Sequence, residues 1–161
     1  MKDSTRKLAW IAMLYAAQGL PYGVVHKIWP VYFRAHGVSL KEIGLMSLLA
    51  LPWSWKPLWA PLIDRFGPRR AWIVPCLGAL AAIAFVMTLL PAEKVGPLMI
   101  AFLLTFTLAS ATQDIAIDAW AVDAATGRVL GLMNGMRASA FRVAVIATGG
   151  QKAIGPVSSA P

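Results

Sequence analysis

The chain has 161 residues, of which 58% are hydrophobic and only 14% are charged, and its formal net charge is +8. A water-soluble domain usually has about 45–50% apolar and about 25% charged residues. The composition therefore excludes an ordinary soluble globule and a disordered tail, and it predicts an integral membrane protein. The single cysteine, Cys76, excludes a disulfide framework and a cysteine-based zinc site, and two histidines are too few for a histidine-rich metal centre.

The apolar runs are long enough to cross a membrane, which takes about 20 mainly apolar residues. In chain order they predict four full transmembrane helices and a partial fifth, at about residues 8–33, 43–63, 71–90, 97–122 and 129–148. Because the connections are short, consecutive helices are expected to be antiparallel neighbours. Ser39 is placed to be the N-cap of the second helix. The predicted fold is an all-α transmembrane bundle over residues 1–150, followed by a non-helical tail over residues 151–161.

Lysine and arginine concentrate at alternate ends of the predicted helices. They lie at the N-terminus, in the connection at residues 64–70 and just after the fourth helix. The positive-inside rule therefore predicts a cytoplasmic N-terminus. The same charges punctuate apolar runs and form no continuous basic face, which argues against a nucleic-acid partner and for the lipid bilayer.

Prolines and glycines interrupt the first two helices. Gly19, Pro21 and Gly23 lie in the first, and Pro52 and Pro57 lie in the second. Such breaks free backbone groups that neighbouring helices or water must satisfy. Two interpretations stay open. The breaks are kinks that serve helix packing, or they are the hinges or substrate-lining breaks of a transporter.

Charged and polar side chains inside these helices need a partner, water or a function. The second and fourth helices are expected to run in the same direction across the membrane. At about 1.5 Å per residue, Lys56 lies about 22 Å along the second helix and Asp114 about 25 Å along the fourth, at nearly the same level. Asp118 shares a face with Asp114, and Gln113 is adjacent. We hypothesise that Lys56 and Asp114 share a polar cavity in which the carboxylate loads and releases a proton. The alternative is a structural ion pair that only fixes helix packing.

The connection between the second and third helices combines one acid with three arginines. It contains Asp64, Arg65, Gly67, Arg69 and Arg70. An orientation signal alone explains the arginines but not the acid and the glycine. The functional interpretation is a cytoplasmic gate, in which Asp64 bonds a helix N-terminus or an arginine in one state and releases it in another.

Several stretches together resemble the AmpG-like branch of the major facilitator superfamily. They are residues 18–23 (QGLPYG), 56–61 (KPLWAP), 61–70 (PLIDRFGPRR), 110–120 (SATQDIAIDAW) and 141–142 with 149–150. This branch includes muropeptide permeases, acetyl-coenzyme A transporters and some siderophore transporters. The resemblance covers roughly residues 8–150 and implies part of an N-terminal helical bundle of that superfamily.

The resemblance also implies a function. It implies a proton-driven transporter of a small-molecule solute in the bacterial inner membrane, without a cofactor. The resemblance further implies that Lys56, Gln113, Asp114 and Asp118 have roles in a polar cavity. It implies that the loop residues Asp64, Arg65, Gly67, Arg69 and Arg70 have roles in a gate. The family has about twelve helices in two repeats, with the substrate site between the halves. The residues after Gly150 do not continue the pattern. The sequence is therefore interpreted as a truncated product that lacks the C-terminal helical half and is inactive alone.

Two other functions compete with transport. A small membrane scaffold or partner subunit would use the G-x-x-x-G pair Gly131 and Gly135, which predicts close helix packing, but would need no acid–base cluster. An intramembrane enzyme would use Asp114 and Asp118 as a carboxylate pair. No nucleophile elbow, metal-ligand cluster or phosphate loop accompanies these aspartates, so an enzyme is not predicted.

Overall fold

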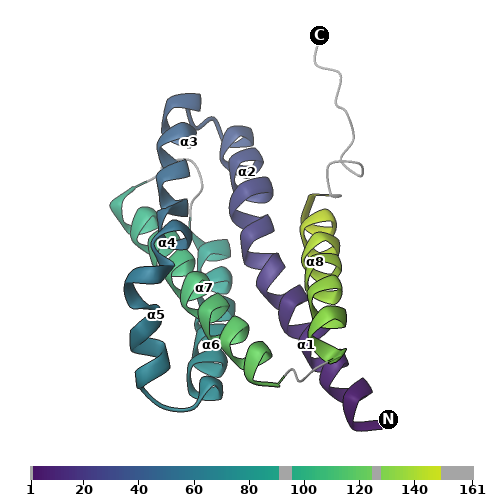
Figure 1. Ribbon diagram of the computed structural model, residues 1–161. Coiled ribbons are helices and arrows are strands. Elements are labelled where there is room, and N and C mark those ends of the chain that lie inside the picture. Colours follow the sequence, from purple (N-terminus) through teal and green to yellow (C-terminus); the bar gives the residue numbers. More distant parts are fainter. Residues whose placement is uncertain (1, 91–95, 125–127, 150–161) are drawn as a thin grey trace.

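The computed structural model describes residues 2–90, 96–124 and 128–149, and every regular element in them is helical. The predicted tail over residues 151–161 lies outside the described residues. The elements are α1 (Lys2–Gly23), the π-helical turn η1 (Val24–Ile28), α2 (Trp29–Ala35), α3 (Leu40–Met46), the 3₁₀ turn η2 (Ser47–Ala50), α4 (Leu51–Ser54), α5 (Lys56–Arg65), α6 (Arg69–Leu89), α7 (Pro97–Ala124) and α8 (Arg128–Gly149). They run up and down in a bundle, with α7 crossing behind α4 and continuing beside α5, and with α1 beside α8 (Figure 1).

Three of these helical stretches are long and apolar enough to cross a membrane. They are Arg6–Ala35, Arg69–Leu89 and Pro97–Asp123. The first contains the π-helical turn η1, which follows Pro21 and Gly23. A proline has no backbone N–H and disturbs the helical hydrogen-bond ladder, and π turns occur where that ladder is interrupted.

The second predicted helix, expected over residues 43–63 with interruptions at Pro52 and Pro57, is divided into four pieces. Its hydrogen bonds tighten to a 3₁₀ turn at Ser47–Ala50 just before Pro52, and the helix breaks at Trp55 between α4 and α5. Pro57 follows that break, and neither proline can donate a helical hydrogen bond. The start of this segment agrees with the sequence, because Ser39 caps α3 as predicted. The Ser39 hydroxyl accepts a hydrogen bond from the Glu42 backbone N–H at 3.2 Å.

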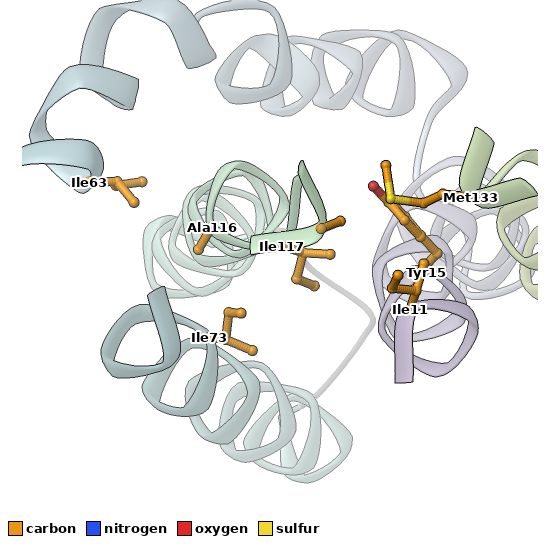
Figure 2. Packing of buried hydrophobic residues seen from close by; sticks show 8 residues of the cluster. Ile11, Tyr15, Ile63, Ile73, Ala116, Ile117 and Met133 are labelled. Carbon is orange, nitrogen blue, oxygen red and sulfur yellow. The ribbon is translucent and has the colours of Figure 1, made fainter. Parts of the chain in front are cut away.

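The core of the bundle forms two hydrophobic clusters at different levels of α7. At one level, Ala116 and Ile117 of α7 lie between α6 and α5 on one side and α1 and α8 on the other (Figure 2). At the other level, Met99 and Leu103 of α7 pack against Phe33 of α2. Asp114 lies between these levels on α7. The polar site described below is therefore enclosed along the bundle axis by apolar packing.

The bundle has one basic end. The N-terminal end of α1, the α5–α6 loop and the C-terminal end of α7 lie together at the bottom of the view (Figure 1). The α2–α3 connection and the start of α7 lie at the opposite end. This placement matches the alternation of charged connections in the sequence.

Candidate functional site

One face of α7 carries buried polar side chains in the middle of an apolar helix. Thr107, Ser110, Gln113 and Asp114 are all buried. Thr107, Ser110, Asp114 and Asp118 recur at intervals of three or four residues, which places them along one face of a helix. A polar stripe of this kind inside a membrane bundle needs internal partners or an aqueous cavity.

Asp114 is bound by two donors from the broken second helix. Lys56 Nζ donates to Asp114 Oδ2 at 2.7 Å, and Trp53 Nε1 donates to the same oxygen at 3.1 Å. The Asp114 side chain is only 6% exposed, whereas Lys56 is 26% exposed. Because the helix breaks at Trp55, the end of α4 and the start of α5 present Trp53 and Lys56 to one carboxylate oxygen.

A cavity of about 370 Å³ borders this ion pair. Its walls come from α1, α4, α5, α7 and α8, and they consist of Tyr15, Gln18, Tyr22, Trp53, Lys56, Asp114, Asn134, Arg137, Ala138 and Phe141. Pockets that hold small molecules start at about 300 Å³. Gln18 Oε1 and Asp114 Oδ1 are buried and have no hydrogen-bond partner among the described residues. The cavity thus has acceptors suited to a proton, water or a donor group of a solute.

A second charged pair lies one helical turn further along α7. Arg137 of α8 approaches Asp118 Oδ2 with one guanidinium nitrogen at 3.4 Å. Its guanidinium carbon lies 5.3 Å from the centre of the Tyr15 ring on α1. The ion pair joins α7 to α8, and Arg137 also contacts α1. The pair lies on the side of the cavity that faces the basic end of the bundle. It is longer and more exposed than the Lys56–Asp114 pair.

The structure does not bring Gln113 into this cluster. The side chain is fully buried, it does not line the cavity, and both of its amide atoms lack a partner among the described residues. Adjacent helical positions point about 100° apart, so a neighbour of Asp114 in sequence need not share its surroundings. Asp114 and Asp118, four residues apart, do keep to one side of α7.

The predicted gate residues do not form a single cluster. Arg69 bonds Asp64 at 2.8 Å and reaches Asp123 at the end of α7 at 3.5 Å. Gly67 has φ +77°, a left-handed conformation that other residues rarely adopt, so the glycine permits the turn. Arg65 lies over the Phe66 ring, with 6.0 Å between its guanidinium carbon and the ring centre. Arg70 takes part in none of these contacts and lines a different pocket, described below.

The glycines of the first helix allow a close approach of α8. A Cβ atom on Gly19 would lie 2.8 Å from Ala144 Cβ, and one on Gly23 would collide with the Thr148 side chain. Pro21 is buried between them. The glycine pair predicted to pack, Gly131 and Gly135, has no described neighbour within 4 Å of its Cβ positions. The close glycine contact is therefore made by α1.

Sequence reasoning did not assign several residues to the site. They are Gln18 and Tyr22 on α1, Trp53 on α4, Arg137 on α8 and Asp123 at the end of α7. Gln18 and Arg137 had a signal available, since polar side chains inside apolar helices mark functional or paired positions. No rule of spacing connects Trp53 or Asp123 with its partner.

The described residues contain no group of three or more His, Cys, Asp or Glu side chains placed to hold a metal ion. The site chemistry visible in this part of the chain is that of ion pairs, amides and aromatic rings. Such groups bind protons and charged or polar solutes directly.

Comparison with known proteins gives consistent relatives. A protein-family model described as "Acetyl-coenzyme A transporter 1" matches residues 7–91, just over half of the chain. An uncharacterized protein of Haemophilus influenzae is 35% identical over 153 residues, covering 91% of this chain and 36% of its own length. The anhydromuropeptide permease of Escherichia coli K12 is 30% identical over 148 residues, covering 88% of this chain and 30% of its own length. An uncharacterized protein of Schizosaccharomyces pombe is 33% identical over 152 residues.

The chain spans about a third of the length of the curated relatives it matches. No solved structure matches it. The family match covers the broken second helix and the arginine-rich loop, and the matched relatives extend through most of the chain. The chain belongs to the acetyl-coenzyme A transporter family, in the AmpG-like group of membrane transporters.

Proposed function

We propose that this chain forms the N-terminal part of a proton-coupled solute transporter in the bacterial inner membrane, with its N-terminus in the cytoplasm. The observation that carries the proposal is the Lys56–Asp114 ion pair, held at 2.7 Å beside a cavity that α1, α4, α5, α7 and α8 line. A buried pair of this kind stabilises a fold poorly in comparison with apolar packing, so its presence favours a functional role. Family membership supports transport as that role.

In the proposed cycle, Asp114 is the proton acceptor. A proton on its carboxylate removes the charge that holds Lys56, and the ammonium is then available to an acidic group of the solute. Loss of the proton restores the pair and expels the solute. Gln18 and Arg137 supply further polar contacts in the cavity. The solute class we propose is muropeptide-type, because the E. coli relative is an anhydromuropeptide permease.

The loop between α5 and α6 is the proposed cytoplasmic gate. Arg69 connects this loop to the end of α7 through Asp64 and Asp123. Both acids are more than half exposed, so these bonds exchange readily with water. Movement of α7 relative to α5 would therefore break them at small energetic expense. Transport is proposed to need helices beyond those of this chain, since the relatives are about three times as long.

A chimera tests the proposal. Residues 1–149 replace the matching segment of the E. coli permease, and uptake of labelled anhydromuropeptide is measured in cells that lack their own permease. We expect uptake that rises with external acidity, and a loss of about tenfold or more in the Asp114→Asn chimera, since proton transfer by a positioned group contributes about 10²–10⁴-fold. Ser54→Ala, an exposed position near Lys56, is the matched control.

Two results would contradict the proposal. One is an Asp114→Asn chimera with normal uptake and normal pH dependence, which removes the proton role. The other is a stably inserted chimera that carries no solute while the unaltered permease does. If the chain alone then retrieved a single stable membrane partner, the scaffold interpretation would replace transport.

A further inference from the structure

A second pocket lies at the basic end of the bundle, on the outer surface of α1, α6 and α7. It has a volume of about 600 Å³. Three cations line it, Arg6 and Lys7 from α1 and Arg70 from α6. None of them forms an ion pair with a carboxylate among the described residues; the four ion pairs found there involve other cations.

The rest of the pocket is apolar and extends away from the charges along the helices. Its walls include Leu14 on α1, together with Ile73, Val74 and Leu77 on α6. Leu14 and Leu77 each lie seven residues beyond a cation of the pocket, which corresponds to about 10 Å along a helix. Val74 is 66% exposed, so the groove opens to the surroundings of the bundle.

The position of this pocket coincides with a membrane surface. The three membrane-crossing stretches begin at Arg6, begin at Arg69 and end at Asp123, so the cations lie where the helices enter the bilayer. Two tryptophans, Trp10 and Trp120, complete the lining. Tryptophan gathers at the level of the lipid headgroups, and basic pockets between transmembrane helices bind anionic headgroups.

We propose that this pocket binds an anionic phospholipid, with its phosphate among Arg6, Lys7 and Arg70 and an acyl chain in the groove beside Val74. Charge complementarity selects the occupant. A further transmembrane helix seated in the groove would cover the apolar wall, whereas a lipid phosphate also supplies the negative charge that these three cations lack among the described residues. The site is separate from the Lys56–Asp114 cavity, with which it shares no lining residue.

The test uses the 161-residue chain reconstituted in phosphatidylcholine vesicles. Phosphatidylglycerol with brominated acyl chains is added, and quenching of tryptophan fluorescence is compared with that by brominated phosphatidylcholine. We expect stronger quenching by the anionic lipid at equal mole fraction. This excess is expected to disappear in the Trp10→Phe/Trp120→Phe variant, which lacks the two reporters in the pocket.

Charge variants locate the binding. In Arg6→Gln/Lys7→Gln/Arg70→Gln, apparent affinity for the anionic lipid should fall by at least about tenfold, since each basic residue near an anionic surface contributes a factor of about five. The matched control Lys27→Gln/Lys41→Gln/Arg142→Gln removes three exposed cations elsewhere and should change affinity less than about twofold. Val74→Phe, which narrows the groove at an exposed position, should weaken binding without altering charge.

Three outcomes would overturn the proposal. Equal losses in both triple variants would show attraction by net charge alone. Equal quenching by the two lipids, unaffected by the pocket variants, would indicate an apolar groove of the kind that another helix covers. Displacement of the lipid by soluble glycerol phosphate at matching concentration would indicate an anion site without acyl-chain recognition.

Discussion

Two sets of ion-paired aspartates, Asp114 inside the bundle and Asp64 with Asp123 at its basic end, share their chemistry and differ in their surroundings. Asp114 is 6% exposed and bonds Lys56 at 2.7 Å inside the bundle. Asp64 and Asp123 are 56% and 63% exposed and bond Arg69 at 2.8 Å and 3.5 Å at the basic end. Exposed ion pairs contribute about 0–1 kcal/mol, whereas removing one partner of a buried pair leaves an uncompensated charge. Separating the buried Lys56–Asp114 pair is therefore expected to cost more free energy than separating the exposed pairs of the loop.

The largest effect is expected from breaking the buried pair. Lys56→Met leaves the Asp114 carboxylate without its counter-ion, and we expect the free energy of unfolding to fall by about 2–4 kcal/mol. This is slightly below the range for fully buried pairs because Lys56 keeps some exposure. The measurement is denaturant unfolding of the purified chain in micelles.

Two variants sharpen that result. Lys56→Met/Asp114→Leu removes both charges and should recover most of the loss, because apolar replacement of a buried pair is often neutral. Lys27→Met, at an exposed lysine, should leave the free energy of unfolding nearly unchanged. A single Lys56 variant as stable as the parent chain would show that Asp114 is solvated and that the contrast between the two regions is false.

The close contact between α1 and α8 gives the next largest effect. Gly19→Val places a branched side chain against Ala144 and the Phe141 carbonyl, to which even a Cβ would lie at 2.8 Å and 3.0 Å. We expect a loss of about 1–3 kcal/mol from overpacking, measured by the same unfolding experiment. Gly78→Val is the matched control, since no described atom lies within 4 Å of its Cβ position. Equal losses in both variants would mean that α1 and α8 do not approach closely.

A smaller effect is expected in the loop cluster. Arg69→Gln removes both exposed ion pairs and a bond to the Ile63 carbonyl at 3.3 Å. We expect a loss of about 0.5–1 kcal/mol that shrinks as salt is added, because salt screens exposed charges. Lys41→Gln is the control for loss of one exposed cation. A loss as large as that of Lys56→Met, and insensitive to salt, would contradict the assignment of the loop as an easily opened gate.

The smallest effect concerns an exposed acid outside the membrane-crossing stretches. Hydrogen bonds from the Ser39 hydroxyl and backbone N–H lower the pKa of Glu42 from its usual 4.5. A lowered pKa in the folded state stabilises the cap above the unfolded value, and this contribution disappears as the pH falls through the folded value. Glu42→Gln should therefore speed amide hydrogen exchange at the start of α3 at neutral pH but not in acid. A difference that persists in acid would exclude the charge as its cause.

Much of the fold follows from local patterns in the sequence. Apolar runs of about 20 residues indicate membrane helices without reference to their neighbours, and Ser39 followed by Glu42 specifies a cap within four residues. The prolines of the second segment were visible too. The sequence did not show that this helix breaks at Trp55, because proline can either kink a helix or begin a new one.

The candidate site was only partly accessible to such reasoning. Counting residues along the second and fourth helices, which are expected to run in the same direction, placed Lys56 and Asp114 at one level, and the structure brings them into contact. Gln113 was expected to join them because it is next to Asp114 in the sequence, but its side chain does not line the cavity. Depth along a helix is a one-dimensional quantity, and it does not specify which neighbour a side chain faces.

The sequence by itself determined the membrane class, the helical segments, the basic end and the level of the central charges. These features depend on composition, on hydrophobic periodicity and on the distribution of charge, all of which are local properties of the chain. The tertiary structure decided which donors meet at Asp114, that Asp123 joins Arg69, and that Arg70 turns to a pocket with Arg6 and Lys7. These contacts join residues far apart in sequence. Their geometry depends on how α1, α7 and α8 pack, and close packing depends on small local features such as the absent side chain of Gly19.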